Sequence, residues 1–249
     1  MKVYDIYSFL NEHYPFSLAC DFDNTGLLIG DKNTIVTKAV IALDCTSSAV
    51  EFAAQNGAEL IITHHPVIFG GLKSVTQETA TYKAIKNGIS VISAHTNLDV
   101  AEGGVNDALC EALGLKNTQK YICEDGFAIR LGSLKDEMSA REFAKTSAAA
   151  LSANARFVDS GKPIKTVAVC SGAGSDMLHD AIKSGADAYV SSEIKHNVFI
   201  DAAENSFTVI DLGHFATEKI IVKRLYELLT ASMPEIEFIP YEREIVEYI

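Results

Sequence analysis

The feature that most constrains the fold is a pattern that occurs twice along the chain. In the first copy an apolar run at residues 38–42 is followed by a segment of helical character and a second apolar run over residues 57–64. The second copy has the same order, with its apolar runs at residues 165–169 and 185–193. Alternating strands and helices are typical of α/β folds with parallel or mixed sheets. The sequence therefore predicts two similar α/β lobes with mixed sheets. The alternative is a chance similarity between hydrophobic strands.

Each copy leads to one more apolar strand with a histidine directly after it. His95 follows the strand of the first copy and His214 follows that of the second. Ligands of such sheets gather beyond the carboxyl ends of the strands. We therefore predict an internal duplication, with residues 1–125 in the first lobe, residues 126–249 in the second, and a site between the lobes.

Composition excludes several classes of function. The 249 residues carry a formal net charge of −12 and no run of Lys and Arg, which disfavours nucleic-acid binding. The five cysteines are scattered and contain no Cys-x-x-Cys pair, so a disulfide framework is not expected and a reduced, cytoplasmic compartment fits best. No apolar run is long enough for a membrane helix, and the N-terminus does not read as a signal peptide.

Two adjacent histidines end the second apolar run of the first copy. Residues 60–63 lead into His64 and His65, and Pro66 follows. Imidazole is a common ligand of transition metals. Neighbouring side chains of a regular strand point to opposite faces, so both rings can reach one cavity only where the strand ends, and Pro66 favours that ending. The alternative is one buried and one surface histidine.

Carboxylates and a further histidine occur at two other strand ends. If a helix begins near His214, then His214 and Glu218 lie four residues apart on one helical face and can serve the same metal. Asp99 lies at a polar strand tip that also holds His95. Alternatively, Glu218 is an acidic residue at a helix start with His214 nearby by chance, and Asp99 is an ordinary turn aspartate.

The predicted ligands outnumber those of a single tetrahedral site, which usually has three protein ligands and a water. Two metal ions per chain, which together activate a water for hydrolysis, account for them better. The donor types accept zinc, iron, manganese or nickel. His95 is a candidate general acid–base or partner of a ligand, and Glu193 a candidate for contacting substrate. The five predicted metal ligands are His64, His65, Asp99, His214 and Glu218.

Several motifs in this chain resemble those of one known family, the GTP cyclohydrolase I type 2 homologues, or YbgI-like proteins. The motifs are ITHHPVIFGGLK, SAHTNLD, GVNDALCEALGL, CSGAGS, GADAYVSSE and DLGHFATE, and the match runs from residue 23 to residue 218. The resemblance implies two intertwined α/β lobes, a dinuclear metal site and a ring-shaped homohexamer. It also implies that His64, Asp99 and Glu218 hold one metal. His65, His214 and Glu218 would hold the other, with Glu218 as the bridge.

The resemblance further implies a metal-dependent hydrolase that opens the imidazole ring of a purine nucleotide. Hydroxide would attack C8, and His95 or Glu193 would move protons. The alternative is a non-catalytic metal-binding protein that forms a ring scaffold or regulates a partner. The chain departs from the family in reading Ser191-Ser192-Glu193 where threonine-glycine-glutamate is usual, and in lacking the middle domain of longer members.

Overall fold

The computed structural model describes residues 1–247, which divide into two compact units. The first unit combines residues 1–101 with the chain from Ile221 onward, and the second comprises residues 102–220. The sequence placed a single division at 125/126, whereas these units divide at 101/102 and at 220/221. The reason is that the last strand returns to pair with a strand near the N-terminus, so the C-terminal segment belongs to the first unit's sheet.

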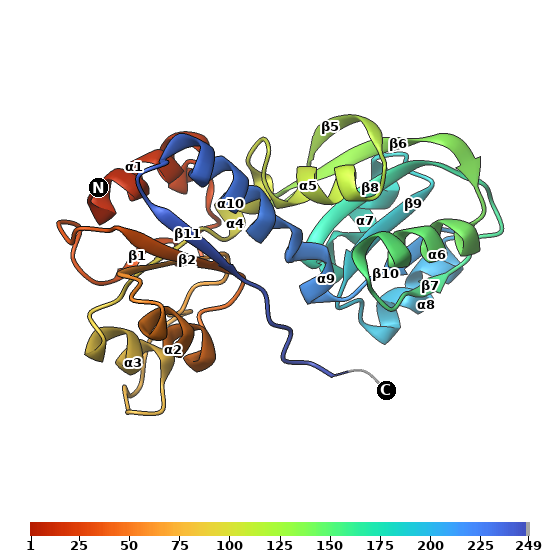
Figure 1. The fold of residues 1–249 in the computed structure, drawn as a ribbon. Coiled ribbons are helices and arrows are strands. Elements are labelled where there is room, and N and C mark those ends of the chain that lie inside the picture. The colour runs from red at the N-terminus through yellow and green to blue at the C-terminus, as the bar shows by residue number, and fades with distance from the viewer. Residues whose placement is uncertain (248–249) are drawn as a thin grey trace. The chain divides into compact units, whose positions relative to one another are not determined.

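The first unit contains a five-stranded sheet in the order β1-β4-β3-β2-β11. Its elements are α1 (Val3–His13), a 3-10 helix (Phe16–Leu18), β1 (Gly26–Ile29), β2 (Lys38–Ala42), α2 (Ser47–Gln55), β3 (Leu60–Thr63), α3 (Ala80–Lys86), β4 (Ser90–Ser93), α4 (Thr96–Val100), α10 (Ile220–Ser232) and β11 (Glu237–Tyr241). Strands β11, β2, β3 and β4 are parallel, and β1 pairs antiparallel with β4. Helices α2 and α3 cover one face, and α1 and α10 lie over the other (Figure 1).

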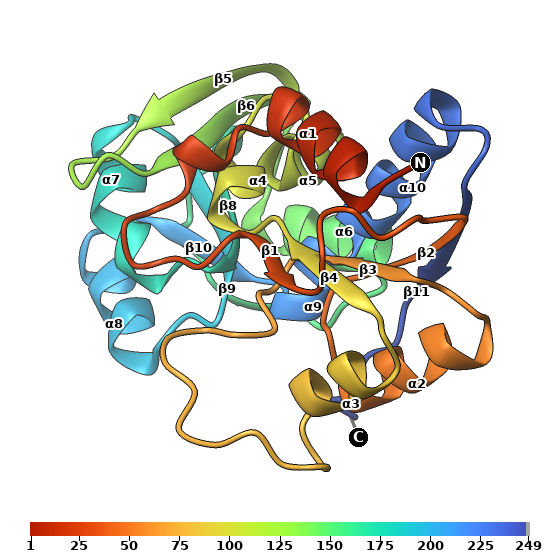
Figure 2. The ribbon, with the colours of Figure 1, turned by 90° about the vertical axis from the view of Figure 1, so that its left-hand side faces the viewer.

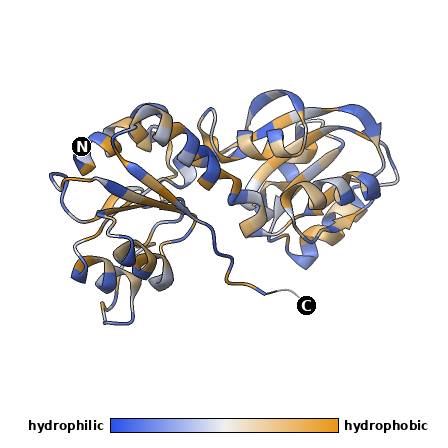
Figure 3. Ribbon diagram, viewed as in Figure 1, coloured by the Kyte–Doolittle hydropathy of each residue, from blue (hydrophilic) through white to orange (hydrophobic). Residues whose placement is uncertain are grey.

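The core of the first unit follows from the alternation of side chains along its strands. Val40, Ile61 and Val91 are neighbours on adjacent strands and pack in one cluster with Val50 and Ala53 of α2. Successive side chains of a strand point to opposite faces, so these three residues lie on the same face of the sheet. Hydrophobic residues accordingly run along the central strands (Figure 3).

The second unit contains a six-stranded sheet in the order β5-β6-β8-β9-β10-β7. Its elements are α5 (Val105–Ala112), β5 (Lys116–Ile122), β6 (Ala128–Met138), α6 (Ala140–Leu151), β7 (Arg156–Val158), β8 (Ile164–Ala173), a 3-10 helix (Ser175–Met177), α7 (Leu178–Lys183), β9 (Ala188–Ser192), α8 (His196–Glu204), β10 (Thr208–Asp211) and α9 (His214–Glu218). Strands β8, β9 and β10 are parallel, and the other pairings are antiparallel.

Two cores lie on the two faces of this second sheet. Val190 and Ile210 pack with α5 and α6 residues such as Phe143. Tyr189 and Val209, one residue earlier on the same strands, pack with α7 and α8 residues on the other face. Apolar side chains thus alternate between the two faces along each strand. A sheet that is covered by helices on both faces requires this pattern.

The fold class predicted from the repeated pattern is confirmed. The parallel sets β2-β3-β4 and β8-β9-β10 correspond to the two copies. Strand β7 was not predicted, and the polar tip at residues 95–99 is the start of helix α4. In the described part of the chain, none of the helices is long and apolar enough to cross a membrane.

Candidate functional site

The His-His pair lies at the end of β3, where the sequence predicted that the strand would stop. Strand β3 ends at Thr63, and the His65 amide still donates to the Leu43 carbonyl at 2.9 Å. The two imidazole centroids are 4.9 Å apart and the ring planes differ by 40°. His64 is fully buried, and the His65 side chain is 23% exposed. The two rings therefore lie beside each other at the same edge of the sheet (Figure 2 shows this end of β3).

Both rings are anchored through Nδ1. His64 Nδ1 donates to the Ala94 carbonyl oxygen at 2.9 Å, and His65 Nδ1 donates to Asp44 Oδ1 at 2.7 Å. A carbonyl oxygen only accepts, so His64 carries a proton on Nδ1, and a neutral ring then has its lone pair on Nε2. Histidines that bind metal commonly use this arrangement, because the second hydrogen bond fixes the ring orientation.

Asp99 lies against His64. Helix α4 places Asp99 Oδ1 3.5 Å from His64 Nε2, and the aspartate is 7% exposed. The Nε2 lone pair of a neutral imidazole and a carboxylate oxygen are both acceptors, so their approach favours a proton or a cation between them. The first unit therefore brings together three of the five predicted ligands.

His95 joins this group from the start of α4. One ligating atom each from His64, His65 and His95 lies within 4.8 Å of the others. His95 Nδ1 donates to Asp23 Oδ1 at 2.8 Å, and the Asp23 side chain is fully buried. Burial alone would raise the pKa of Asp23, but hydrogen bonds from His95 and Thr96 outweigh it and lower that pKa below its usual range. Asp23 is therefore an ionised acceptor beside the imidazole.

The second unit holds the other two predicted ligands on helix α9. The predicted spacing of four residues places His214 Nε2 2.9 Å from Glu218 Oε2. Gly213 precedes the helix at φ 81°, a conformation that favours glycine. Glu218 is 3% exposed, so its carboxylate is buried. Here again an imidazole Nε2 faces a carboxylate oxygen.

Gly172 makes room for the Glu218 carboxylate. A Cβ atom at Gly172 would lie 2.1 Å from Glu218 Oε1 and 3.4 Å from His214 Nε2. The Gly172 amide donates to the Thr217 hydroxyl at 3.2 Å, which ties the end of β8 to α9. The CSGAGS motif, residues 170–175, therefore leaves space for an acidic side chain.

Glu193, predicted to contact substrate or move protons, is placed against His214. Its Oε1 accepts from His214 Nδ1 at 2.8 Å, and its side chain is 58% exposed. The residue follows β9 at φ 52°, a left-handed backbone conformation uncommon for residues other than glycine. Glu193 thus anchors its histidine as Asp44 anchors His65.

Asp23, Asp44 and Gly172 were not identified as site residues from the sequence. Asp44 directly follows the apolar run 39–43, so it had the same signal as the predicted ligands, namely a carboxylate at a strand end. Asp23 lies in the polar turn at residues 21–26, and nothing local shows that this turn meets His95. The role of Gly172 could be recognised only once the position of Glu218 was known.

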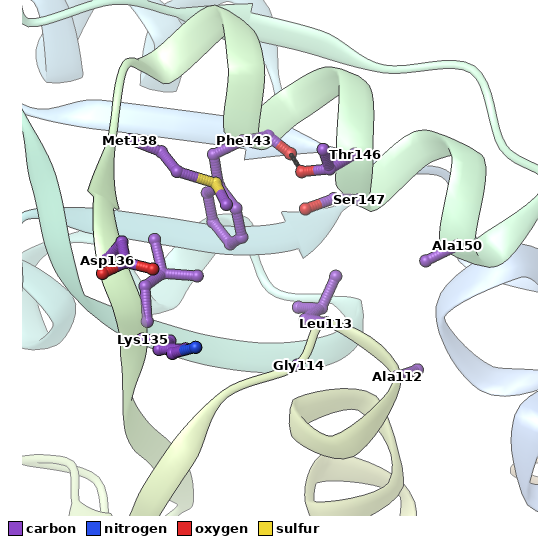
Figure 4. A pocket seen from close by; sticks show the side chains of 11 residues that line it. Ala112, Leu113, Gly114, Lys135, Asp136, Met138, Phe143, Thr146, Ser147 and Ala150 are labelled. Carbon is purple, nitrogen blue, oxygen red and sulfur yellow. Dashed lines mark hydrogen bonds between the residues drawn. The ribbon is translucent and has the colours of Figure 1, made fainter.

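A cavity of about 390 Å³ lies elsewhere in the second unit (Figure 4). It is bordered by the end of α5, by β6 and by one face of α6. Its wall is mostly apolar, with Met138, Phe143 and Leu113 at its centre and Lys135 and Asp136 near one side. None of the predicted ligands borders it.

The donor set fits a first-row transition metal. Imidazole nitrogens and carboxylates are ligands for these ions, and the hydrogen-bonded Nδ1 atoms supply the expected support for the rings. The groups in the structure could therefore bind metal.

Comparison with known proteins finds relatives over nearly the whole chain. The family described as Duf34/NIF3 (NGG1p interacting factor 3) matches residues 1–244. A protein of Clostridium perfringens named GTP cyclohydrolase 1 type 2 homolog is 34% identical over 251 residues, covering 96% of this chain and 95% of its own. A Staphylococcus aureus protein of the same name is 41% identical over 155 residues, which are 56% of this chain and 41% of that protein.

Solved structures share the whole fold. A hypothetical protein from Staphylococcus aureus has a TM-score of 0.92 and 29% identity, covering 100% of this chain and 99% of its own. Reduced HcgD from Methanocaldococcus jannaschii has a TM-score of 0.85 and 31% identity, covering 98% of each chain. These matches confirm the resemblance seen in the motifs. The chain belongs to the Duf34/NIF3 (NGG1p interacting factor 3) family.

Proposed function

We propose that this protein is a metal-dependent hydrolase that binds two divalent ions per chain. The proposed ligands are His64, His65, Asp99, His214 and Glu218. The observation that carries the proposal occurs twice: an imidazole Nε2 faces a buried carboxylate oxygen, in His64–Asp99 and in His214–Glu218, while Nδ1 of the same ring donates to an acceptor. In these positions a cation removes the repulsion between two acceptors.

Glu218 is the proposed bridge between the two ions. Its two oxygens are held in different surroundings, with Oε2 towards His214 and Oε1 in the space that Gly172 leaves. A carboxylate can offer one oxygen to each of two cations. On this proposal His64 and Asp99 complete one site with Glu218, while His65 and His214 complete the other, as the family resemblance implies.

When bound, two such ions would supply Lewis acidity and an activated water for hydrolysis. The protein's own residues orient the ligands and move protons. Asp44 and Glu193 hold the rings of His65 and His214 through Nδ1. His95 is the proposed proton carrier, since its ring lies beside those of His64 and His65 at centroid distances of 5.2 and 5.5 Å.

The proposed substrate is a purine nucleotide whose imidazole ring is opened at C8. The support is the name shared by the relatives, GTP cyclohydrolase 1 type 2 homolog. Opening the ring adds water across a carbon–nitrogen bond, which is the kind of step that an activated water and a nearby imidazole serve.

A second candidate is a non-catalytic metal-binding scaffold that assembles as a ring or contacts a partner protein. Phe22 is 70% exposed and Phe69 is 61% exposed. Aromatic residues are enriched in protein–protein interfaces, so these two exposed rings favour contact with a partner. Under this proposal the metals stabilise the assembly and no substrate is turned over.

One experiment separates the two candidates. Protein stripped with a chelator is reloaded with zinc, iron(II), manganese or nickel and incubated with GTP and a panel of other purine nucleotides. We expect loss of the purine absorbance and formation of the ring-opened formamide only from metal-loaded samples. Two bound metals per chain with no turnover on the whole panel would refute the hydrolase and leave the scaffold.

A further inference from the structure

We propose that Asp23 is a positioning residue that holds His95 with its proton on Nδ1, so that Nε2 acts as the base in the hydrolysis. The role as a base rests on the proposed function, whereas the tautomer does not. Asp23 lies in a turn far from His95 in the sequence, and the structure brings the two together.

The Asp23 carboxylate is fixed through both of its oxygens. Oδ1 accepts from His95 Nδ1 at 2.8 Å. Oδ2 accepts from the Thr96 amide at 3.0 Å and from the Thr96 hydroxyl at 2.6 Å. Because the side chain is fully buried, water does not compete for these bonds. The carboxylate therefore cannot rotate away from the imidazole without losing several contacts.

The chemistry of this carboxylate decides where the imidazole proton lies. An ionised carboxylate only accepts hydrogen bonds, and the contacts from His95 and Thr96 keep Asp23 ionised. His95 Nδ1 must then be the donor, which leaves the lone pair of the neutral ring on Nε2. A buried aspartate that fixes the tautomer of a catalytic histidine does the same in serine proteases.

The orientation of the His95 ring leaves the Nε2 lone pair available to accept a proton. His95 contributes a nitrogen to the group formed with His64 and His65. Its Nδ1 is held on Asp23, so the nitrogen available to that group is Nε2. His95 is 19% exposed at its side chain, partly open to solvent, whereas Asp23 behind it is closed off. Asp23 thus lies on the far side of the ring from the proposed metal ligands.

In the proposed step, the water oxygen bonds to C8 of the purine while one of its protons moves to His95 Nε2. Asp23 stays ionised and stabilises the imidazolium that forms. The electron pair of the C8–N7 double bond moves to N7, which takes the proton of the new C8 hydroxyl as the C8 carbonyl forms. The proton on Nε2 passes to N9 as the C8–N9 bond breaks, and His95 returns to the neutral tautomer.

The test is Asp23→Asn in the full chain. The amide oxygen can still accept from Thr96, while the amide nitrogen donates to His95 Nδ1 and moves the ring proton to Nε2. Ring nitrogen shifts of 15N-histidine-labelled, chelated protein report the tautomer, and the signal is assigned by its loss in His95→Gln. We expect the tautomer to change, two metals still to bind, and GTP turnover to fall by about 10²- to 10⁴-fold.

Two matched variants separate positioning from other roles. Asp44→Asn alters the same kind of pair at His65, a proposed ligand, and should weaken metal binding by about 10- to 100-fold. Thr96→Val removes one structural contact of Asp23 and should leave the His95 tautomer unchanged.

The proposal is overturned if His95 in Asp23→Asn keeps its proton on Nδ1. It is also overturned if Asp23→Asn loses metal as Asp44→Asn does, since His95 would then be a ligand. Wild-type protein that binds metal without turning over GTP counts against the proposed function instead. In that case the tautomer and the metal content decide the positioning role.

Discussion

Replacing Gly172 by alanine tests the cradle around Glu218 directly. The added Cβ would lie 2.1 Å from Glu218 Oε1 and 3.2 Å from Cδ, whereas contacts under 3.0 Å are essentially never seen. The carboxylate must therefore move by about 1 Å, and metal–ligand distances tolerate deviations of only about 0.2 Å. We expect Gly172→Ala to lose at least one of the two metals or to bind it at least about 10-fold more weakly, as changes around metal ligands commonly do.

The backbone contributes a separate effect that a control can isolate. Gly172 has φ +62°, and an alanine in the left-handed region costs about 1–2 kcal/mol. Gly185 in the same unit has φ +78°, and a Cβ atom added there would meet no atom of the described residues within 4 Å. Gly185→Ala should therefore lose a similar free energy of unfolding and keep both metals.

The assay is metal titration of chelated protein by calorimetry, with urea unfolding of the same metal-free samples. Equal metal affinity in Gly172→Ala and wild type would refute the cradle. An equal loss of metal in Gly185→Ala would show that destabilisation of the unit, not the contact with Glu218, is responsible.

Three further predictions concern the same residues and the assembly. Elemental analysis should find about two transition-metal ions per wild-type chain. Glu218→Gln should disrupt both sites, because an amide cannot offer anionic oxygens to two cations. His65→Ala should instead leave one site partly filled. The pKa of Asp23 in the folded state lies below its ordinary value of about 3.9, so ionised Asp23 contributes its full stability above that pH and loses it as the pH falls further. The difference in unfolding free energy between chelated wild type and Asp23→Asn should therefore shrink below about pH 4. Light scattering should give a ring-sized homohexamer, and a monomer at micromolar concentration would exclude it.

Much of the fold could be predicted because its signals are local. The run before His64 and its counterpart before Glu193 show the apolar composition of buried strands, and both are strands in the structure. The spacing of His214 and Glu218 predicted a shared helical face, and α9 provides it. Ser139 and Glu142 have the sequence spacing of a capping box, and their reciprocal hydrogen bonds are present at the start of α6.

The parts that were missed depend on contacts between distant segments. Strand β7 has only three residues and one antiparallel neighbour, too short for a pattern to show. The Asp23–His95 pair joins residues 72 positions apart. The predicted lobe boundary differs from the unit boundaries because the pairing of β11 with β2 cannot be seen in the sequence of β11 alone. Local patterns indicate the strands, the helices and the candidate ligands, whereas the residues that hydrogen-bond to those candidates are set by tertiary pairing.

The discontinuous first unit has a consequence for the order in which the protein is made. On the ribosome, residues 1–101 emerge first, yet their sheet lacks β11 until residues 237–241 are synthesised. The second unit is continuous in the chain and is complete well before that. During this interval β2 is an open edge with unpaired backbone groups, the kind of edge to which other strands add. The nascent chain is therefore most vulnerable to misassembly at β2, and that edge closes only once residues 237–241 have left the ribosome.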